Sequence, residues 1–358
     1  MSKIKILCLN FFSILTLNVS SQSDHIIRPK TYTAFKTNEL INIDGLDKEL
    51  VWKSVKWSSN FVDIEGTKTP IYQTNFKMIW DDNYFYILAK IQEPHVWGNI
   101  SEKDAVIFHN NDFEVFIDPD GDTHNYYELE INALNTVWDL FLTKPYRELG
   151  SPVINDWNIT GLKSAVHVNG TLNNPSDIDT GWNLEIAIPL SVFKTSYYQD
   201  VKPKGEFWRI NFSRVNWDYE LIEGEYSRKK NNTGDLSKEF NWVWSPQGVV
   251  NMHEPEKWGY VYFSSLQEAG DEIPFKIPKD EEIKWELYKM YRTQKAYFSN
   301  TNQWQTTIKS IQPTPVILYG HSLKPFIENY GSGWIISIKS PFSDKLLTIK
   351  EDGEFKIK

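Results

Sequence analysis

The chain has 358 residues, of which 41% are hydrophobic and 24% charged, so it can bury a core as two domains or as one larger domain with an appendage. Its formal net charge of -9 disfavours a nucleic-acid partner, because phosphate binding requires clustered Lys and Arg, and it leaves room for a cation. The 15 Trp, 18 Tyr and 20 Phe predict a Trp-rich core and also a surface that stacks on flat ligands such as sugar rings.

Residues 1–22 have the pattern of a secretory signal peptide. Lys3 and Lys5 precede a short apolar run at 6–17, and small serines follow it. We therefore expect an exported protein, located in the periplasm, at the cell surface or in the medium. Cys8 is the only cysteine and lies inside this segment, so the mature protein would contain no thiol. No other stretch is long and apolar enough to span a membrane.

Short alternating segments between turn residues follow, up to about residue 264. Segments 76–80 and 84–88 form a hairpin across the Asp-Asp-Asn turn at 81–83. Further strands are expected at 113–118, 126–132, 137–142, 165–168, 182–188, 208–215 and 259–263. Because no helices alternate with them, residues 24–264 are predicted to form a mainly β domain, an antiparallel β-sandwich of the immunoglobulin-like or jelly-roll-like type.

The composition changes towards the C-terminus. Residues 265–279 are polar and contain prolines, which is typical of a linker. Within 280–298, Ile283 and Leu287 share a helical face with Met290 and Tyr291, and short strands follow. We expect residues 280–358 to form a small α+β appendage, in which no motif indicates a function and whose protein partner, if it has one, is open.

Two of the predicted strands carry polar side chains on one face. Glu128, Glu130 and Asn132 alternate with apolar residues on one strand, and Arg209 and Asn211 do so on another. If these faces lie in one sheet, they form a floor that suits sugar hydroxyls, which both donate and accept hydrogen bonds. The alternative is an ordinary solvated face. Nearby aromatic residues could form a wall beside this floor, although most of them belong in the core: Trp97, Phe108, Trp138, Trp157, Trp217, Trp242 and Trp244.

Asp118, Asp120 and Asp122 resemble a calcium-binding loop in the spacing of their oxygens, without the complete EF-hand pattern. The alternative is a plain turn, because Asp and Gly favour turns. Asp177 and Asp179 form a second, weaker candidate. A structural calcium ion is therefore the one cofactor that the sequence suggests.

A glycoside hydrolase would need two carboxylates that face each other across the scissile bond. Glu114, Glu128, Glu130 and Glu185 are available, but no spacing assigns a pair, so we assign no catalytic residue. A structural envelope protein, in which the sandwich scaffolds a partner of the C-terminal appendage, is a third hypothesis.

The order of these segments resembles the family 9 carbohydrate-binding modules, in their family-9-like branch of DOMON-like sandwiches. The similarity extends over about residues 24–264 and depends on several short motifs in one order. These motifs are Ile43-Asp44-Gly45 with Asp47 and Trp52, Trp80-Asp81 with Tyr84 and Tyr86, the acidic strand 111–118, Gly181-Trp182 with Glu185 and Ile188-Pro189, the strand 208–214, Trp244-Ser245-Pro246, and Pro255-Glu256-Lys257-Trp258-Gly259.

The resemblance implies a β-sandwich that binds sugars without cleaving them, clamps a terminal sugar between two aromatic rings and carries structural calcium. It places the acidic sugar contact on Glu114 and the first clamping aromatic on Phe108. Glu130 stands where the family has an arginine that contacts the sugar, and Met252 stands where the family has the second clamping aromatic. We therefore predict non-catalytic binding of a mono-, oligo- or polysaccharide, linked to polysaccharide recognition or breakdown. The predicted ligand-binding residues are Trp97, Phe108, Glu114, Glu130, Asn132, Arg209, Asn211, Trp244, Met252 and His253.

Overall fold

The computed structural model describes residues 27–148, 150, 153–194, 203–266 and 275–358. The predicted signal segment 1–22 lies outside these residues. Among the helices of the described ranges, none combines the length and the apolar character needed to cross a bilayer.

Thirteen strands form one hydrogen-bonded sheet in the order β8-β7-β6-β5-β11-β15-β1-β3-β4-β10-β9, with β14 paired to both β11 and β2. The strands are β1 (Thr31–Lys36), β2 (Val62–Asp63), β3 (Thr74–Trp80), β4 (Tyr84–Gln92), β5 (Asp112–Asp118), β6 (Tyr126–Asn132), β7 (Val137–Leu142), β8 (Val153–Ile154), β9 (Lys163–Asn169), β10 (Gly181–Pro189), β11 (Phe207–Asn216), β14 (Phe240–Val243) and β15 (Gly259–Ser264). The expected hairpin is present as β3 and β4, with Trp80 paired to Phe85.

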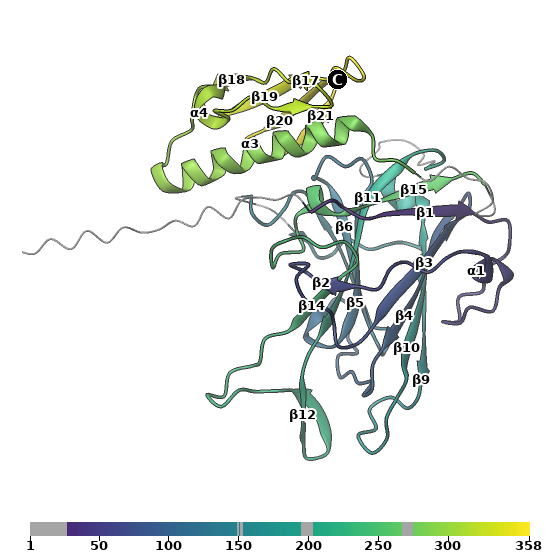
Figure 1. Ribbon diagram of the computed structural model, residues 1–358. Helices are drawn as coiled ribbons and strands as arrows, with labels where there is room; N and C mark the ends of the chain where they lie inside the picture. The colour runs from purple at the N-terminus through teal and green to yellow at the C-terminus, as the bar shows by residue number, and fades with distance from the viewer. Residues whose placement is uncertain (1–26, 149, 151–152, 195–202, 267–274) are drawn as a thin grey trace, which may run out of the picture.

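The sheet curls so that its two halves face each other as the layers of a sandwich (Figure 1). Apolar side chains on alternate positions of β3 and β4 meet those of β5, β6 and β11 in one core. The Phe76 ring on β3 lies 4.1 Å from the Phe212 ring on β11, measured between centroids. Phe85 on β4 contacts Trp208 on β11 at 6.5 Å. The predicted mainly β sandwich is thus confirmed.

Strand β1 departs from the expected antiparallel arrangement. It runs parallel to β15, with Thr31 opposite Tyr260, and also parallel to β3, with Phe35 opposite Ile79. A hairpin turn forces neighbouring strands to be antiparallel, but β1 is joined to neither partner by such a turn, so its direction is not fixed in that way. The sheet is therefore mixed, and β1 joins its two halves.

A short helix, α1 (Leu50–Ser54), covers the outer face of β3, β4 and β10 with the buried side chains of Val51 and Trp52. Up to residue 266, the other described elements outside the large sheet are the hairpin of β12 (Tyr219–Ile222) and β13 (Glu225–Arg228) and three 3-10 turns, η1 (Ile107–His109), η2 (Leu190–Phe193) and η3 (Pro255–Lys257).

The C-terminal part has a core of its own around one long helix, α3 (Lys279–Thr301), which packs against a four-stranded antiparallel sheet (Figure 1). The expected helical face forms, because Ile283, Leu287, Met290 and Tyr291 are all buried. The other elements are α4 (Ile308–Ile311), the paired β16 (Ile317–Leu318) and β17 (His321–Ser322), and the sheet strands β18 (Phe326–Tyr330), β19 (Gly333–Lys339), β20 (Leu346–Lys350) and β21 (Phe355–Ile357).

Helix α3 also packs against the sandwich. Arg209 of β11 forms an ion pair with Glu281 at 3.4 Å, and both side chains are buried. Lys284 donates a hydrogen bond to the backbone oxygen of Gly121. The sandwich and the C-terminal part therefore share a polar, buried interface.

Candidate functional site

An open cleft of about 410 Å³ lies on the outer face of the β5-β6-β7 half of the sandwich. Its size falls within the range of small-molecule sites. Within the described residues, its lining consists of Ile64, Phe108, Glu114, Phe116, Glu128, Glu130, Trp138, Tyr146, Val215, Glu239, Asn241, Val250, Asn251, Met252 and His253. The cleft thus combines aromatic rings with carboxylates and has no Lys or Arg in that lining.

The register of the strands builds an acidic floor. Glu114 of β5 lies directly opposite Glu130 of β6, and Phe116 lies opposite Glu128, so these side chains share one face. On the other side of β5, Glu114 is paired with Ser213 of β11. The polar faces predicted for β6 and β11 therefore do lie in one sheet, with β5 between them.

Aromatic side chains stand along the edge of this floor. Trp138 of β7 is opposite Glu130 in the register, and its ring stacks on that of Phe108 at 6.4 Å with an interplanar angle of 22°. Phe108 lies in η1, where its backbone N–H donates to Glu130 Oε2 at 2.9 Å. Further along, the ring of Tyr146 meets that of His253 edge-on at 4.3 Å. These rings can contact the C–H faces of a flat ligand, while the glutamates accept hydrogen bonds from its hydroxyls.

Burial disfavours the ionised form of the carboxyl groups on this floor. It raises the pKa of Glu114 to about 7, and burial together with the neighbouring carboxylates raises the pKa of Asp112, Glu128 and Glu130 well above the usual range. Burial, and secondarily Arg147, lowers the pKa of His253 to about 3, so its imidazole is neutral at pH 7. The described lining of the cleft therefore has no cationic side chain, while the buried Arg214 acts electrostatically on Asp112 alone among these four carboxylates.

The segment that carries Met252 and His253 is held in place by contacts with β6 and α3. Tyr126 of β6 shares a hydrogen bond with His253 Nδ1 at 2.9 Å. The next residues include Glu254 and Glu256, which are buried and form ion pairs with Arg292 of α3. The C-terminal helix thus supports one side of the cleft.

Five of the predicted ligand-binding residues line this cleft: Phe108, Glu114, Glu130, Met252 and His253. The other five lie elsewhere, namely Trp97, Asn132, Arg209, Asn211 and Trp244. Each of these is buried and has a structural environment. Asn211 exchanges hydrogen bonds with the backbone of Ser245, and Trp244 packs in the sandwich core against Phe76.

Asn132 accepts hydrogen bonds from the backbone of Leu134 and Thr136, so it shapes the turn after β6. Trp97 stacks on Tyr226 at 6.1 Å, in a small cluster beside the β12–β13 hairpin.

Arg209 faces the C-terminal helix instead of a ligand. Its guanidinium donates to the backbone oxygens of Glu256 and Trp258 and to the hydroxyl of Tyr260. The sequence shows on which face of β11 this arginine lies, but not that α3 covers that part of the face.

Three residues of the cleft lining are absent from the predicted ligand-binding residues: Glu128, Trp138 and Tyr146. Glu128 and Trp138 were visible in the pattern of alternating strands, as a carboxylate and an aromatic on the relevant face. Tyr146 comes from an irregular segment after β7, and no periodicity in the sequence indicates its position.

The aspartate loop after β5 brings oxygen ligands of Asp118, Asp120 and Asp122 within 4.8 Å of one another. Asp118 accepts backbone hydrogen bonds from Gly121 at 3.0 Å and Thr123 at 2.9 Å, which shape the loop. An all-oxygen set of this kind fits the chemistry of Ca²⁺. Lys284, which binds the carbonyl of Gly121, places a positive charge at the same loop.

The second acidic candidate behaves as a turn. Asp179 accepts hydrogen bonds from the backbone N–H groups of Val96 and Thr171, and Asp177 accepts one from the Thr171 hydroxyl.

Of the four glutamates considered for a glycoside hydrolase, Glu114, Glu128 and Glu130 line the cleft. Glu185 lies on β10, outside the cleft, where it accepts hydrogen bonds from Trp52 Nε1 and from the backbone of Asp44 and Gly45. Glu114 and Glu130 are neighbours on one floor, and no catalytic role is assigned to either.

The model of a family described as carbohydrate family 9 binding domain-like matches residues 43–204. Among solved structures, a Bacteroides uniformis protein provisionally described as carbohydrate-binding is 17% identical, with 66% of this chain and 99% of that chain covered and a TM-score of 0.45. A family 9 carbohydrate-binding module from Caldicellulosiruptor kristjanssonii, solved with cellotriose and with glucose, is 16% identical, with 69% and 100% covered and a TM-score of 0.43. No curated protein matches.

Proposed function

Because residues 43–204 are a carbohydrate family 9 binding domain-like segment, we propose that this protein binds a saccharide, without cleaving it, in the cleft over β5, β6 and β7. The observation that carries this proposal is the stacked pair of Phe108 and Trp138 beside the row of Glu114, Glu128 and Glu130. The rings supply an apolar contact for the sugar face, and the carboxylates supply acceptors for its hydroxyls.

The cleft is open, so it suits the end of a chain or a short oligosaccharide better than an enclosed small molecule. Met252, which stands where the resemblance expects the second clamping aromatic, lines the cleft. A methionine side chain packs against a ring through its polarisable thioether, with less directional preference than an aromatic clamp. We therefore propose an affinity that depends mainly on the Phe108 and Trp138 side of the cleft.

Isothermal titration calorimetry of the full chain against free monosaccharides, cello-oligosaccharides and soluble polysaccharides tests this function. Phe108→Ala should weaken binding about tenfold, since loss of a stacked ring costs on the order of 1 to 1.5 kcal/mol. Tyr297→Ala is a matched control, because it removes an exposed ring of α3 that does not line the cleft. Binding that is equal in Phe108→Ala and the wild type would rule out this cleft as the sugar site.

We propose in addition that a structural Ca²⁺ ion binds Asp118, Asp120 and Asp122, which supply oxygens only. At this position it would stabilise the loop between β5 and β6. Thermal unfolding after treatment with EDTA measures this, and Asp120→Asn should remove the stabilisation by added Ca²⁺.

Export and a connection to polysaccharide breakdown are proposals that rest on the signal-like segment 1–22 and on the family. Expression in a bacterial host followed by N-terminal sequencing of the exported protein tests the first. Growth of a deletion strain on different polysaccharides tests the second.

A further inference from the structure

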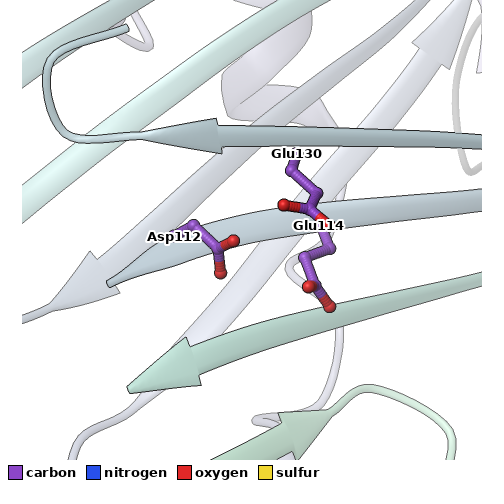
Figure 2. Close-up of side chains that lie close together, drawn as sticks. All are labelled: Asp112, Glu114 and Glu130. Atoms are coloured by element: carbon purple, nitrogen blue, oxygen red, sulfur yellow. The ribbon is translucent and has the colours of Figure 1, made fainter. Parts of the chain in front are cut away.

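Three carboxylates meet at the floor of the cleft: Glu114 and Glu130 line it, and Asp112 is fully buried beside them. Asp112 and Glu114 lie two positions apart on β5, and Glu130 lies opposite Glu114 on β6 (Figure 2). One oxygen from each lies within 4.8 Å of the others, and all three side chains are at least 95% buried, with exposures of 0%, 5% and 2%. Two oxygens on opposite sides of a Ca²⁺ ion lie about 5 Å apart, so this spacing suits ligands of one ion.

The hydrogen bonds of the group are incomplete on the side where these carboxylates meet. Asp112 Oδ1 accepts from the backbone N–H of Val215 at 3.1 Å, and Glu130 Oε2 accepts from that of Phe108. Asp112 Oδ2 is buried and has no partner among the described residues. Figure 2 shows the Asp112 carboxylate on the same side of the strands as those of Glu114 and Glu130. A buried carboxylate oxygen without a partner is costly, and a bound cation would satisfy it.

No side chain in the cleft supplies the missing positive charge. The described lining contains no Lys or Arg, and Glu128 and Glu239 add further negative charge. Where the related family is expected to place an arginine, this chain has Glu130. The substitution reverses the charge in the middle of the floor, so the site differs in kind from one that binds hydroxyls through a guanidinium.

We infer that Asp112, Glu114 and Glu130 bind a divalent cation of the Ca²⁺ class at the floor of the cleft. Three carboxylates provide the hard oxygen ligands that Ca²⁺ prefers, and its remaining coordination positions face the open cleft. Water molecules fill those positions in the free protein. Two neighbouring hydroxyls of a sugar can replace them, and this second step rests on the proposed function.

The cation is tested first without any sugar. The full chain is stripped with EDTA, desalted and titrated with CaCl₂ by calorimetry, and with TbCl₃ while tryptophan is excited. Trp138 lies opposite Glu130, so Tb³⁺ at the floor should give sensitised luminescence that Trp138→Phe reduces while calorimetric Ca²⁺ binding persists. Glu130→Gln and Asp112→Asn should each weaken the cleft binding event by about 100-fold or more, since even changes outside the ligand shell cost 10- to 100-fold.

Two controls separate this site from other acidic groups. Glu225→Gln neutralises an exposed glutamate of β13, outside the cleft lining, and should leave Ca²⁺ binding unchanged. Asp120→Asn changes the aspartate loop and should leave the cleft event intact. Circular dichroism and urea unfolding verify that each variant is folded. A wild type that binds no Ca²⁺ outside the aspartate loop, or a folded Glu130→Gln that binds it like the wild type, would overturn the inference.

Sugar binding is then measured with Ca²⁺ and with EDTA. The expected result is an affinity at least about tenfold higher with Ca²⁺ in the wild type and no such difference in Glu130→Gln. If Ca²⁺ binds at the floor but leaves the sugar affinity unchanged, the step in which hydroxyls join the ion is wrong. If Ca²⁺ binds and no sugar does, the proposed function fails while the cation site stands.

Discussion

Arg292 of α3 provides the sharpest test of how the C-terminal helix supports the cleft. Its guanidinium donates to Glu254 at 3.2 and 2.5 Å and to Glu256, and both carboxylates are buried. Arg292→Gln removes one of the cationic partners of these two carboxylates. Loss of one partner of a fully buried pair costs about 3 to 5 kcal/mol. Arg147, 3.0 Å from Glu256, and Lys257, 3.1 Å from Glu254, stay in place, and Arg292 is 29% exposed, so we expect about 2 kcal/mol.

Urea unfolding of the full chain measures this effect. With an m value of about 3 kcal/mol/M, the midpoint should fall by roughly 0.7 M. Lys289→Gln is the matched control, because Lys289 lies one turn earlier on the same helix, is 39% exposed and, among the described residues, forms its ion pair with Glu286 of that helix. It should change the stability by less than about 0.5 kcal/mol. Equal midpoints for Arg292→Gln and Lys289→Gln would refute the reasoning. Sugar affinity should also fall in Arg292→Gln alone, since the supported segment carries Met252 and His253.

Other predictions follow from the same contacts. Burial raises the pKa of Glu256, but Arg147 and Arg292 outweigh burial and lower this pKa to about 2. The ionised carboxylate therefore stabilises the fold above its unfolded pKa of about 4.5, and this stabilisation is lost as the pH falls towards 2. The urea midpoint should decline over this pH range, and less steeply in Arg292→Gln. Glu185→Gln should cost about 2 kcal/mol in urea unfolding, because the amide cannot accept from Trp52 and two backbone N–H groups as the carboxylate does, and an unchanged midpoint would contradict this. Gly259→Ala should lower the melting temperature strongly or prevent folding, as its Cβ would lie 2.2 Å from the ring of Trp244, whereas Gly331→Ala, with no atom within 4 Å of the added Cβ, serves as a milder comparison.

The strands of the sandwich were accessible from the sequence because each carries its own alternating pattern. Trp208, Ile210 and Phe212 point into the core as their spacing predicts, and Glu128 and Glu130 share the opposite face of their strand. The acidic floor could be predicted to that extent. Which neighbouring strand completes it depends on the pairing of β5 with both β6 and β11, and this is a long-range property.

The rest of the cleft depends on what covers each face. Alternation places Arg209 and Glu130 on outer faces of their strands, yet one is sealed by α3 and the other lines the cleft. Tyr146 and His253 come from segments without regular structure, so neither a period nor a propensity locates them. The parallel strand β1 escaped prediction for the related reason that no local turn determines its direction.

The position of β1 has a consequence for the order in which the protein folds. Residues near the start of the described chain pair with residues from the last strand of the sandwich, as Thr31 does with Tyr260. These contacts close a loop of more than two hundred residues, and the loop entropy must be overcome before the pairing is gained. During synthesis, which begins at the N-terminus, the chain therefore cannot complete the sheet until β15 has been made. Until then, the edges of β1 and β11 that β15 covers are open to other strands, which makes this step the one most exposed to misassembly.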